Sequence, residues 1–280
     1  MARYTFSGHE TFTCKSLWLK KGYDFLASGH LFLDNDAVVA LGVGKNMVSS
    51  IRFWLKAFGL TKSDKLSELA QYLFDDNGAD LFAEDLNTLW LLHYQLVKNQ
   101  VASLYPLLFL EFQREHRLFD REQINAFVKR KCSVPEQKNV YNENTVKKDI
   151  GVLLANYVMP TSKKSLEEYN ALLLDIGLIR SLDKKYVFNQ TSPEQIAPEI
   201  LLFALLDYCE GETTISYDRL QELALIFCLS VPDLIVILQH LSSAYKEQMI
   251  YTDNAGVKNV QWIGEKLDKW VILDKYYKGK

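Results

Sequence analysis

Between residues 31 and 60, hydrophobic and polar positions follow the pattern of two helices joined by a tight turn. Asp34 and Asn35 can cap a short first helix over residues 37–41. Gly42 then supplies the positive φ that a tight turn between helices favours. The second helix repeats apolar residues at i, i+3, i+7 and i+10, which predicts one buried face. These residues are Val48, Ile51, Leu55 and Phe58.

The opposite face of this second helix is polar and basic. Its residue types bind phosphates and base edges when a helix lies in a DNA groove. We expect Lys45, Arg52 and Lys56 to contact phosphates. The residues expected to face bases are Asn46, Ser49 and Ser50. The alternative is an ordinary helical hairpin inside a core.

The rest of the chain alternates between helical periodicity and short strands. Helices are predicted over 64–74, 85–98, 103–115, 121–132 and from residue 144, followed by a hairpin over 177–188. The last ninety residues predict helices over 197–209, 218–227 and 231–244, a strand at 213–215, and a hairpin over 249–262 with its turn at 253–256. A hairpin that follows a helix-turn-helix is typical of a winged helix.

These elements predict a mainly α fold with small β-hairpin wings. Tandem winged-helix (helix-turn-helix) units would be joined by a helical middle segment. We expect three parts: an N-terminal helix-turn-helix unit over 1–76, a helical segment with a second winged-helix-like unit over 77–190, and a C-terminal winged-helix unit over 191–280. The acidic turn at 75–80 and the Thr-Ser-Pro sequence at 191–193 mark the boundaries.

Composition indicates a folded protein, with 48% hydrophobic and 24% charged residues among 280. The net charge of −3 does not point to nucleic acid, but its distribution is uneven. Residues 1–62 hold 8 basic and 4 acidic side chains, a net +4, and residues 191–280 hold 8 and 13, a net −5. Different partners for the two ends would explain this asymmetry, although chance scatter gives differences of this size.

The four cysteines are far apart and form no CxxC pair, which is typical of free thiols in a reducing cytoplasm. The first residues do not resemble a signal peptide, and the most apolar stretch, 86–112, is interrupted by polar residues. We therefore expect a cytoplasmic protein with no membrane segment.

Two motifs raise the question of catalysis. A phosphate-binding loop at Gly44-Lys45 would need glycine at position 39 and serine or threonine at position 46, where this chain has Val39 and Asn46. Nucleotide hydrolysis at this loop is therefore not expected. The second motif combines a histidine and a glutamate with small polar residues between two phenylalanines, as acid–base or metal sites do. We favour a structural or phosphate-contacting role for it, and expect no catalytic residue, metal or cofactor. Its residues are Ser7, Gly8, His9, Glu10 and Thr11.

A second basic group lies further along the chain. Lys147 and Lys148 begin the helix after residue 144, and Lys184 and Lys185 lie in the following hairpin. Together they would form a basic stripe along a DNA backbone, and a solvated charged face is the alternative. By contrast, the last predicted helix, 233–244, has no Lys or Arg and is rich in Leu and Ile. It favours a protein partner for the C-terminal unit, unless these residues are deeply buried.

The segments Phe6–Phe12 and Leu41–Met47 resemble two signatures of a bacterial domain of unknown function, family 4007. The resemblance extends over most of the chain. It implies a gene often found near phosphoadenosine-phosphosulfate-reductase-like proteins, in clusters that resemble DNA phosphorothioation and phage-defence systems. No activity is attached to the family, so the implied role is an accessory DNA-binding or scaffolding subunit.

The sequence therefore predicts a DNA-binding accessory or recruitment subunit of a DNA modification or defence system. It would bind double-stranded DNA through the two basic groups and a protein through its C-terminal unit. The sequence does not decide whether the protein forms a homodimer. The alternative is a protein-interaction scaffold without nucleic-acid contact. An enzyme built on His9 and Glu10 would require both side chains in one open cleft.

Overall fold

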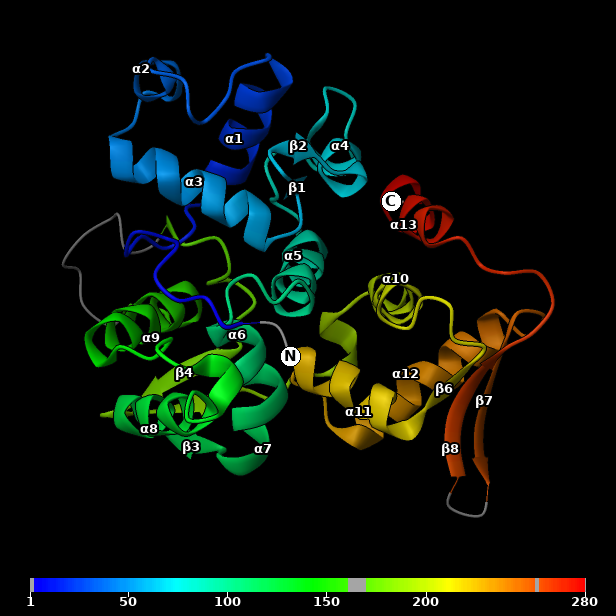
Figure 1. Cartoon of the computed structure of the whole chain (residues 1–280). Coiled ribbons are helices and arrows are strands. Elements are labelled where there is room, and N and C mark those ends of the chain that lie inside the picture. The colour runs from blue at the N-terminus through cyan, green and yellow to red at the C-terminus, as the bar shows by residue number, and fades with distance from the viewer. Residues whose placement is uncertain (1–2, 161–169, 255–256, 280) are drawn as a thin grey trace. The chain divides into compact units, whose positions relative to one another are not determined.

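The computed structural model describes residues 3–160, 170–254 and 257–279 (Figure 1). The chain divides into two compact units, residues 1–189 (unit 1) and 190–280 (unit 2), which are described separately. Residues 1–76 and 77–190, predicted as separate parts, thus lie almost entirely within one compact unit.

Unit 1 begins with three helices around a tight turn: α1 (Trp18–Ala27), α2 (Ala37–Leu41) and α3 (Lys45–Ala57). Gly42 ends α2 at a φ of 61°, as the sequence predicted. Figure 1 shows α3 running beside α1 and α2. The close approach of α1 depends on Gly22, because a Cβ there would lie 2.6 Å from a methyl carbon of Leu55. The apolar face of α3 is buried in this contact.

A hairpin of two very short strands, β1 (Thr61–Lys62) and β2 (Lys65–Leu66), follows α3. Its two turn residues, Ser63 and Asp64, have φ of 51° and 58°, and a two-residue type I′ turn requires a positive φ at both. The prediction that a helix begins at residue 64 was wrong, because residues 64–66 belong to the hairpin. Helix α4 (Glu68–Phe74) begins later, with the Ser67 side chain accepting a hydrogen bond from Ala70 N.

The second half of unit 1 is built on a long buried helix, α5 (Leu86–Lys98). A continuous helical stretch follows, made of α6 (Leu104–Pro106), a π-helical segment η1 (Leu107–Phe112) and α7 (Gln113–Glu115). The remaining elements are β3 (Leu118–Phe119), α8 (Arg121–Lys131), the 3₁₀ turn η2 (Pro135–Gln137), α9 (Glu143–Tyr157), β4 (Ile179–Leu182) and β5 (Lys185–Phe188). The strands form an antiparallel sheet in the order β3-β5-β4. Asp120 caps α8 in a full capping box with Gln123.

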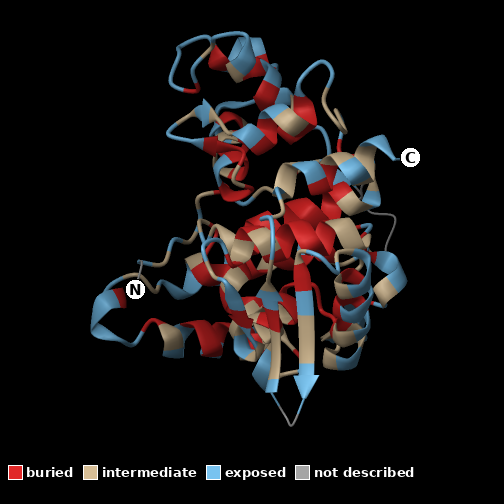
Figure 2. Cartoon of the chain, turned by 90° about the vertical axis from the view of Figure 1, so that its right-hand side faces the viewer, coloured by how far each residue is buried: buried red, intermediate tan, exposed pale blue. Residues whose placement is uncertain are grey.

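Unit 2 starts with the 3₁₀ turn η4 (Pro193–Gln195) and the buried helix α10 (Pro198–Tyr208). It continues with β6 (Thr214–Ser216), α11 (Tyr217–Ile226), α12 (Val231–Ala244), β7 (Met249–Asn254), β8 (Val257–Trp262) and α13 (Lys269–Lys278). Figure 2 shows the β7–β8 hairpin, whose buried residues lie away from its turn. The predicted turn residues Ala255 and Gly256 lie outside the described residues. Helix α13, which the sequence analysis did not predict, packs on α10.

The same order of elements occurs twice, over residues 107–188 and 198–262. Each has a helix, a strand, two helices and a hairpin, and the first strand pairs with the second strand of the hairpin, giving β3-β5-β4 and β6-β8-β7. The predicted class, mainly α with small antiparallel sheets, is confirmed. Among the described residues, every helix is too short or too polar to cross a membrane.

Candidate nucleic-acid interface

Helix α3 presents a polar face to solvent at its N-terminal end and along one side. Lys45, Asn46, Ser49 and Lys56 are all exposed, as the sequence predicted. Lys45 and Asn46 occupy the first turn, directly after the extended Gly44. An exposed lysine can contact phosphate without losing an existing partner, and an exposed amide can reach a base edge.

Ser50, predicted to face a base, does not belong to this face. Its side chain is wholly buried, and its hydroxyl donates a 3.0 Å hydrogen bond to the backbone oxygen of His9. One turn further along α3, the indole nitrogen of Trp54 donates to the backbone oxygen of Phe12, at 3.2 Å. The inner face of α3 is therefore bound to the N-terminal segment, which covers Ser50.

Arg52 is already engaged within the protein. Its Nε and Nη2 donate to the two carboxylate oxygens of Asp64, at 2.9 and 2.6 Å. Because these hydrogen bonds stabilise the charged form, the pKa of the Arg52 guanidinium lies above its ordinary value. This pair joins α3 to the β1–β2 turn, and the predicted phosphate contact of Arg52 stays a prediction that would use its remaining guanidinium N–H groups.

An open pocket of about 760 Å³, the α3–hairpin groove, lies between the second half of α3, the β1–β2 hairpin and residues 99–101. It is lined by the cations Arg52, Lys56 and Lys62, and by hydroxyl and amide groups of Ser49, Thr61, Ser63, Ser67 and Asn99. Among these described lining residues Asp64 is the one carboxylate, and Arg52 compensates its charge. The groove combines uncompensated positive charge with hydrogen-bond donors, which suits the phosphates of a DNA backbone.

The His9 motif is built into the core. His9 is 3% exposed, its Nε2 lies 3.3 Å from an Asp149 carboxylate oxygen, and its ring stacks on Trp54. The other Asp149 oxygen accepts a 2.8 Å hydrogen bond from the Ser7 backbone N–H. A Cβ on Gly8 would lie 2.3 Å from the Phe53 ring. These contacts anchor the N-terminal segment to α3 and α9.

This burial separates the two groups on which an enzyme hypothesis would depend. His9 is enclosed, whereas Glu10 is exposed, so the two do not face one open cleft. Three residues of the motif, Ser7, Glu10 and Thr11, have φ of 66°, 49° and 66°. The left-handed conformation is uncommon for residues with a Cβ, and it is unusual for the β-branched Thr11. The geometry supports the structural role favoured by the sequence analysis.

All four lysines of the second basic group are exposed, but Lys147 is already engaged in ion pairs. Lys147 pairs with Glu143 at 2.8 Å and lies 3.8 Å from Glu122, and the hydrogen bond to Glu143 raises the pKa of the Lys147 ammonium. Lys148 is exposed on the same helix, and Lys184 and Lys185 lie exposed at the β4–β5 turn. In unit 2, the buried residues of α12 are Leu234, Ile237, Leu238 and Leu241, whereas Val236 is 56% exposed. Burial thus explains much of the Leu- and Ile-rich sequence of α12.

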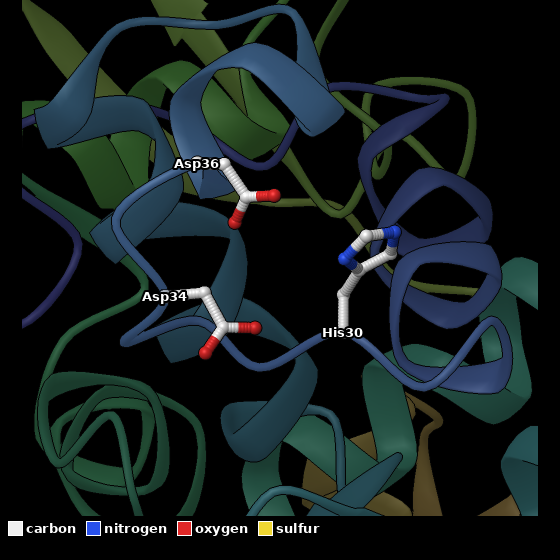
Figure 3. Close-up of side chains that lie close together, drawn as sticks. All are labelled: His30, Asp34 and Asp36. Atoms are coloured by element: carbon white, nitrogen blue, oxygen red, sulfur yellow. The ribbon is translucent and has the colours of Figure 1, made fainter.

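A cluster of potential metal ligands, absent from the sequence-based prediction, lies between α1 and α2 (Figure 3). His30, Asp34 and Asp36 place one ligand atom each within 4.8 Å of one another. Asp34 was expected to cap α2, but its Oδ2 instead accepts a 2.7 Å hydrogen bond from Leu31 N. The spacing His-x3-Asp-x-Asp was the available sequence signal, and it is weak because exposed acidic groups commonly cluster without a metal.

Comparison with known proteins identifies relatives over nearly the whole chain. A family model described as "Protein of unknown function (DUF4007)" matches residues 6–277. Two solved structures, described as "Magnesium ion-bound SspB crystal structure" and "SspB crystal structure", are 25% and 26% identical in sequence. Both have a TM-score of 0.82, and the match covers 98% of this chain and 88% of theirs. No curated protein matches the chain.

The His30 cluster combines two kinds of potential metal ligand. Asp34 and Asp36 offer the carboxylate oxygens that Mg²⁺ prefers, but one oxygen of Asp34 is engaged by the backbone. The third ligand, the His30 imidazole, suits zinc, nickel or copper better than magnesium. The cluster therefore fits a magnesium ion only in part.

Proposed function

Because this chain belongs to the DUF4007 family, we propose that it is a DNA-binding accessory subunit of a bacterial DNA modification or phage-defence system. The family resemblance implies the phosphorothioation type of system. Similarity to SspB over 98% of the chain supports a role among several components. The observation that carries the DNA-binding part is the exposed basic face of α3 beside the α3–hairpin groove.

In this proposal, the N-terminal end of α3 enters the major groove, and Asn46 and Ser49 contact base edges. The β1–β2 hairpin acts as a wing, and the DNA backbone follows the α3–hairpin groove past Lys56 and Lys62. The two repeated arrangements over 107–188 and 198–262 serve as winged-helix units. The first adds Lys148, Lys184 and Lys185 to the DNA surface, and unit 2 recruits a protein partner. The chain performs no catalytic step of its own.

The test is a salt titration of duplex binding. Fluorescence anisotropy with a labelled 20-bp duplex would compare wild type with the double variant Lys45→Ala/Lys56→Ala. The matched control, Lys246→Ala/Lys266→Ala, removes two exposed lysines from unit 2. We expect the first variant to bind more weakly and to lower the slope of log K against log salt by about 2, since each phosphate contact contributes about 0.9. The control should leave the slope unchanged.

A scaffold without nucleic-acid contact is the second candidate. It is favoured by apolar side chains exposed before and within α2: Leu31, Leu33 and Val39 are 56%, 78% and 82% exposed. Exposed apolar residues that gather in one region often mark a protein-binding surface. If wild-type protein fails to bind duplex at 50 mM salt, DNA binding is refuted and the scaffold remains.

A further inference from the structure

A second open pocket in unit 1, the α9 pocket, has a volume of about 550 Å³. Three separate segments form most of it: the N-terminal segment Thr11–Lys15, in which Thr11 has a φ of 66°, the C-terminal half of α9, and the β4–β5 hairpin. Arg121, the first residue of α8, and Met47 of α3 complete the wall. Its lining residues are Thr11, Phe12, Thr13, Lys15, Met47, Arg121, Gly151, Leu154, Ala155, Val158, Met159, Pro160, Ser181 and Tyr186.

The lining of the pocket divides into a polar and an apolar part. The polar part holds two cations, Lys15 and Arg121, with the hydroxyls of threonine, serine and tyrosine residues. The apolar part is made of aromatic, methionine and aliphatic side chains. None of these described lining residues carries a carboxylate. A ligand with a negative charge at one end and a flat, weakly polar body at the other matches this division.

The cationic side of the pocket is held in place by its neighbours. The Nε of Arg121 donates a 3.2 Å hydrogen bond to the Tyr186 hydroxyl, which uses one of five guanidinium N–H groups. The backbone at Arg121 is fixed because it follows the capping box of Asp120. Tyr186 is fixed by pairing with Phe119 across the β3–β5 strands. Such preorganised donors bind an anion with little loss of side-chain freedom.

Gly151 is the strongest indication that the pocket binds a ligand. It lies in the middle of the 15-residue helix α9, where glycine destabilises a helix relative to alanine. A Cβ at Gly151 would meet no atom within 4 Å, so close packing does not require the glycine. Its missing side chain instead leaves space in the pocket that it lines. Thr11 adds a second sign, because strained backbone that is anchored on both sides is often found at binding sites.

We infer that the α9 pocket binds one nucleotide, with the phosphate on the Arg121 side and the base against the apolar wall. Bases bind by stacking on aromatic side chains, as Phe12 and Tyr186 allow. The nucleotide comes either from bound DNA, as an unpaired or extruded residue, or from free solution. The DNA source rests on the proposed function, because Met47 belongs both to α3 and to the pocket.

The experiment compares two ligands and three variants. Anisotropy measures binding of a 20-bp duplex with one central unpaired nucleotide against the fully paired duplex, and calorimetry measures binding of deoxyadenosine monophosphate. Gly151→Leu fills the pocket, and Arg121→Gln removes its charge. Arg114→Gln is the matched control, an exposed arginine outside the pocket. Because a Cβ at position 151 meets open space, Gly151→Leu is expected to melt at or above the wild-type temperature, and Arg121→Gln tests the pocket independently of that substitution.

For the DNA source we expect wild type to prefer the unpaired nucleotide by about tenfold, the contribution of one stacked base. Gly151→Leu and Arg121→Gln should abolish this preference and leave paired-duplex affinity within about twofold of wild type. Binding of the free monophosphate that both variants abolish, without a preference in DNA, supports the pocket with free nucleotide as its source. The inference is overturned if neither ligand responds to either variant. A wild type that binds no duplex refutes only the proposed function, since the monophosphate titration still tests the pocket.

Discussion

The ion pair between Arg52 and Asp64 allows DNA binding by the α3–hairpin groove to be tested with a single conservative substitution. Asp64→Asn replaces a carboxylate oxygen by an amide and removes one negative charge from the groove. Asparagine tolerates the left-handed conformation of this turn residue, whose φ is 58°. Its remaining oxygen can still accept one hydrogen bond from Arg52. The hairpin should therefore stay in place while the guanidinium charge becomes available to DNA.

The magnitudes follow from exposure and charge. The Arg52 and Asp64 side chains are 41% and 27% exposed, and pairs of this kind contribute about 0.2–1 kcal/mol to stability. We expect Asp64→Asn to lower the free energy of unfolding by no more than about 1 kcal/mol. Duplex binding should become tighter, with a salt slope steeper by about 0.9. The gain would then shrink by about 3.5-fold between 50 and 200 mM salt.

The assay is the same anisotropy titration, run at several salt concentrations with a thermal melt of each variant. Asp76→Asn is the matched control, because it changes the charge equally at an exposed position outside the groove. Arg52→Gln should have the opposite effect and weaken binding, since it leaves the Asp64 carboxylate uncompensated. If Asp64→Asn folds normally and binds no tighter than Asp76→Asn, the groove does not hold phosphate and the reasoning is wrong.

Three further predictions use single side chains. Gly8→Ala should destabilise the protein by about 1–3 kcal/mol, because the added Cβ would overlap an aromatic ring of α3. Gly151→Ala should instead stabilise it by about 0.5–1 kcal/mol, because its Cβ meets open space. Urea unfolding measures both free energies of unfolding, and equal effects would contradict the packing argument. Burial raises the pKa of the Cys209 thiol to about 11. At pH 8, Cys209 should therefore react with a thiol reagent far more slowly in native protein than in urea-unfolded protein. Mass spectrometry of the modified peptides measures the two rates, and equal rates would refute this prediction. Lys148→Ala should weaken duplex binding more than Lys147→Ala, whose ammonium is already paired with glutamate, and equal losses would show that the pair opens on DNA.

The local signals in the sequence predicted much of the fold. Gly42 marked the turn before α3, and it does so in the structure. Asp120 and Ser230 are residue types preferred at N-caps, and they cap α8 and α12. The β1–β2 hairpin escaped prediction because its strands are two residues long, and Ser63-Asp64 is not one of the strong type I′ sequences. Strands so short carry no detectable alternation of polar and apolar residues.

The errors at the candidate site have a different cause, since they depend on partners that are distant in the sequence. Ser50 looks polar and exposed on an isolated helix, but its partner is the backbone of His9, 41 positions earlier. For His9 the sequence favoured a structural or phosphate-contacting role, but it could not identify the partner, Asp149, which lies 140 residues later along the chain. Helical periodicity shows which face of α3 meets its neighbouring helices. It does not show that a third segment covers part of the polar face.

The His9 motif connects the two surfaces proposed to bind DNA. The backbone oxygens of His9 and of the following Phe12 accept hydrogen bonds from Ser50 and Trp54 on the inner side of α3, while Thr11 and Phe12 line the α9 pocket. A change at His9 would therefore shift α3 and the pocket together without removing any group that is proposed to contact DNA. If both surfaces bind DNA as proposed, a substitution of the buried His9 would change the geometry of binding although His9 itself contacts no DNA.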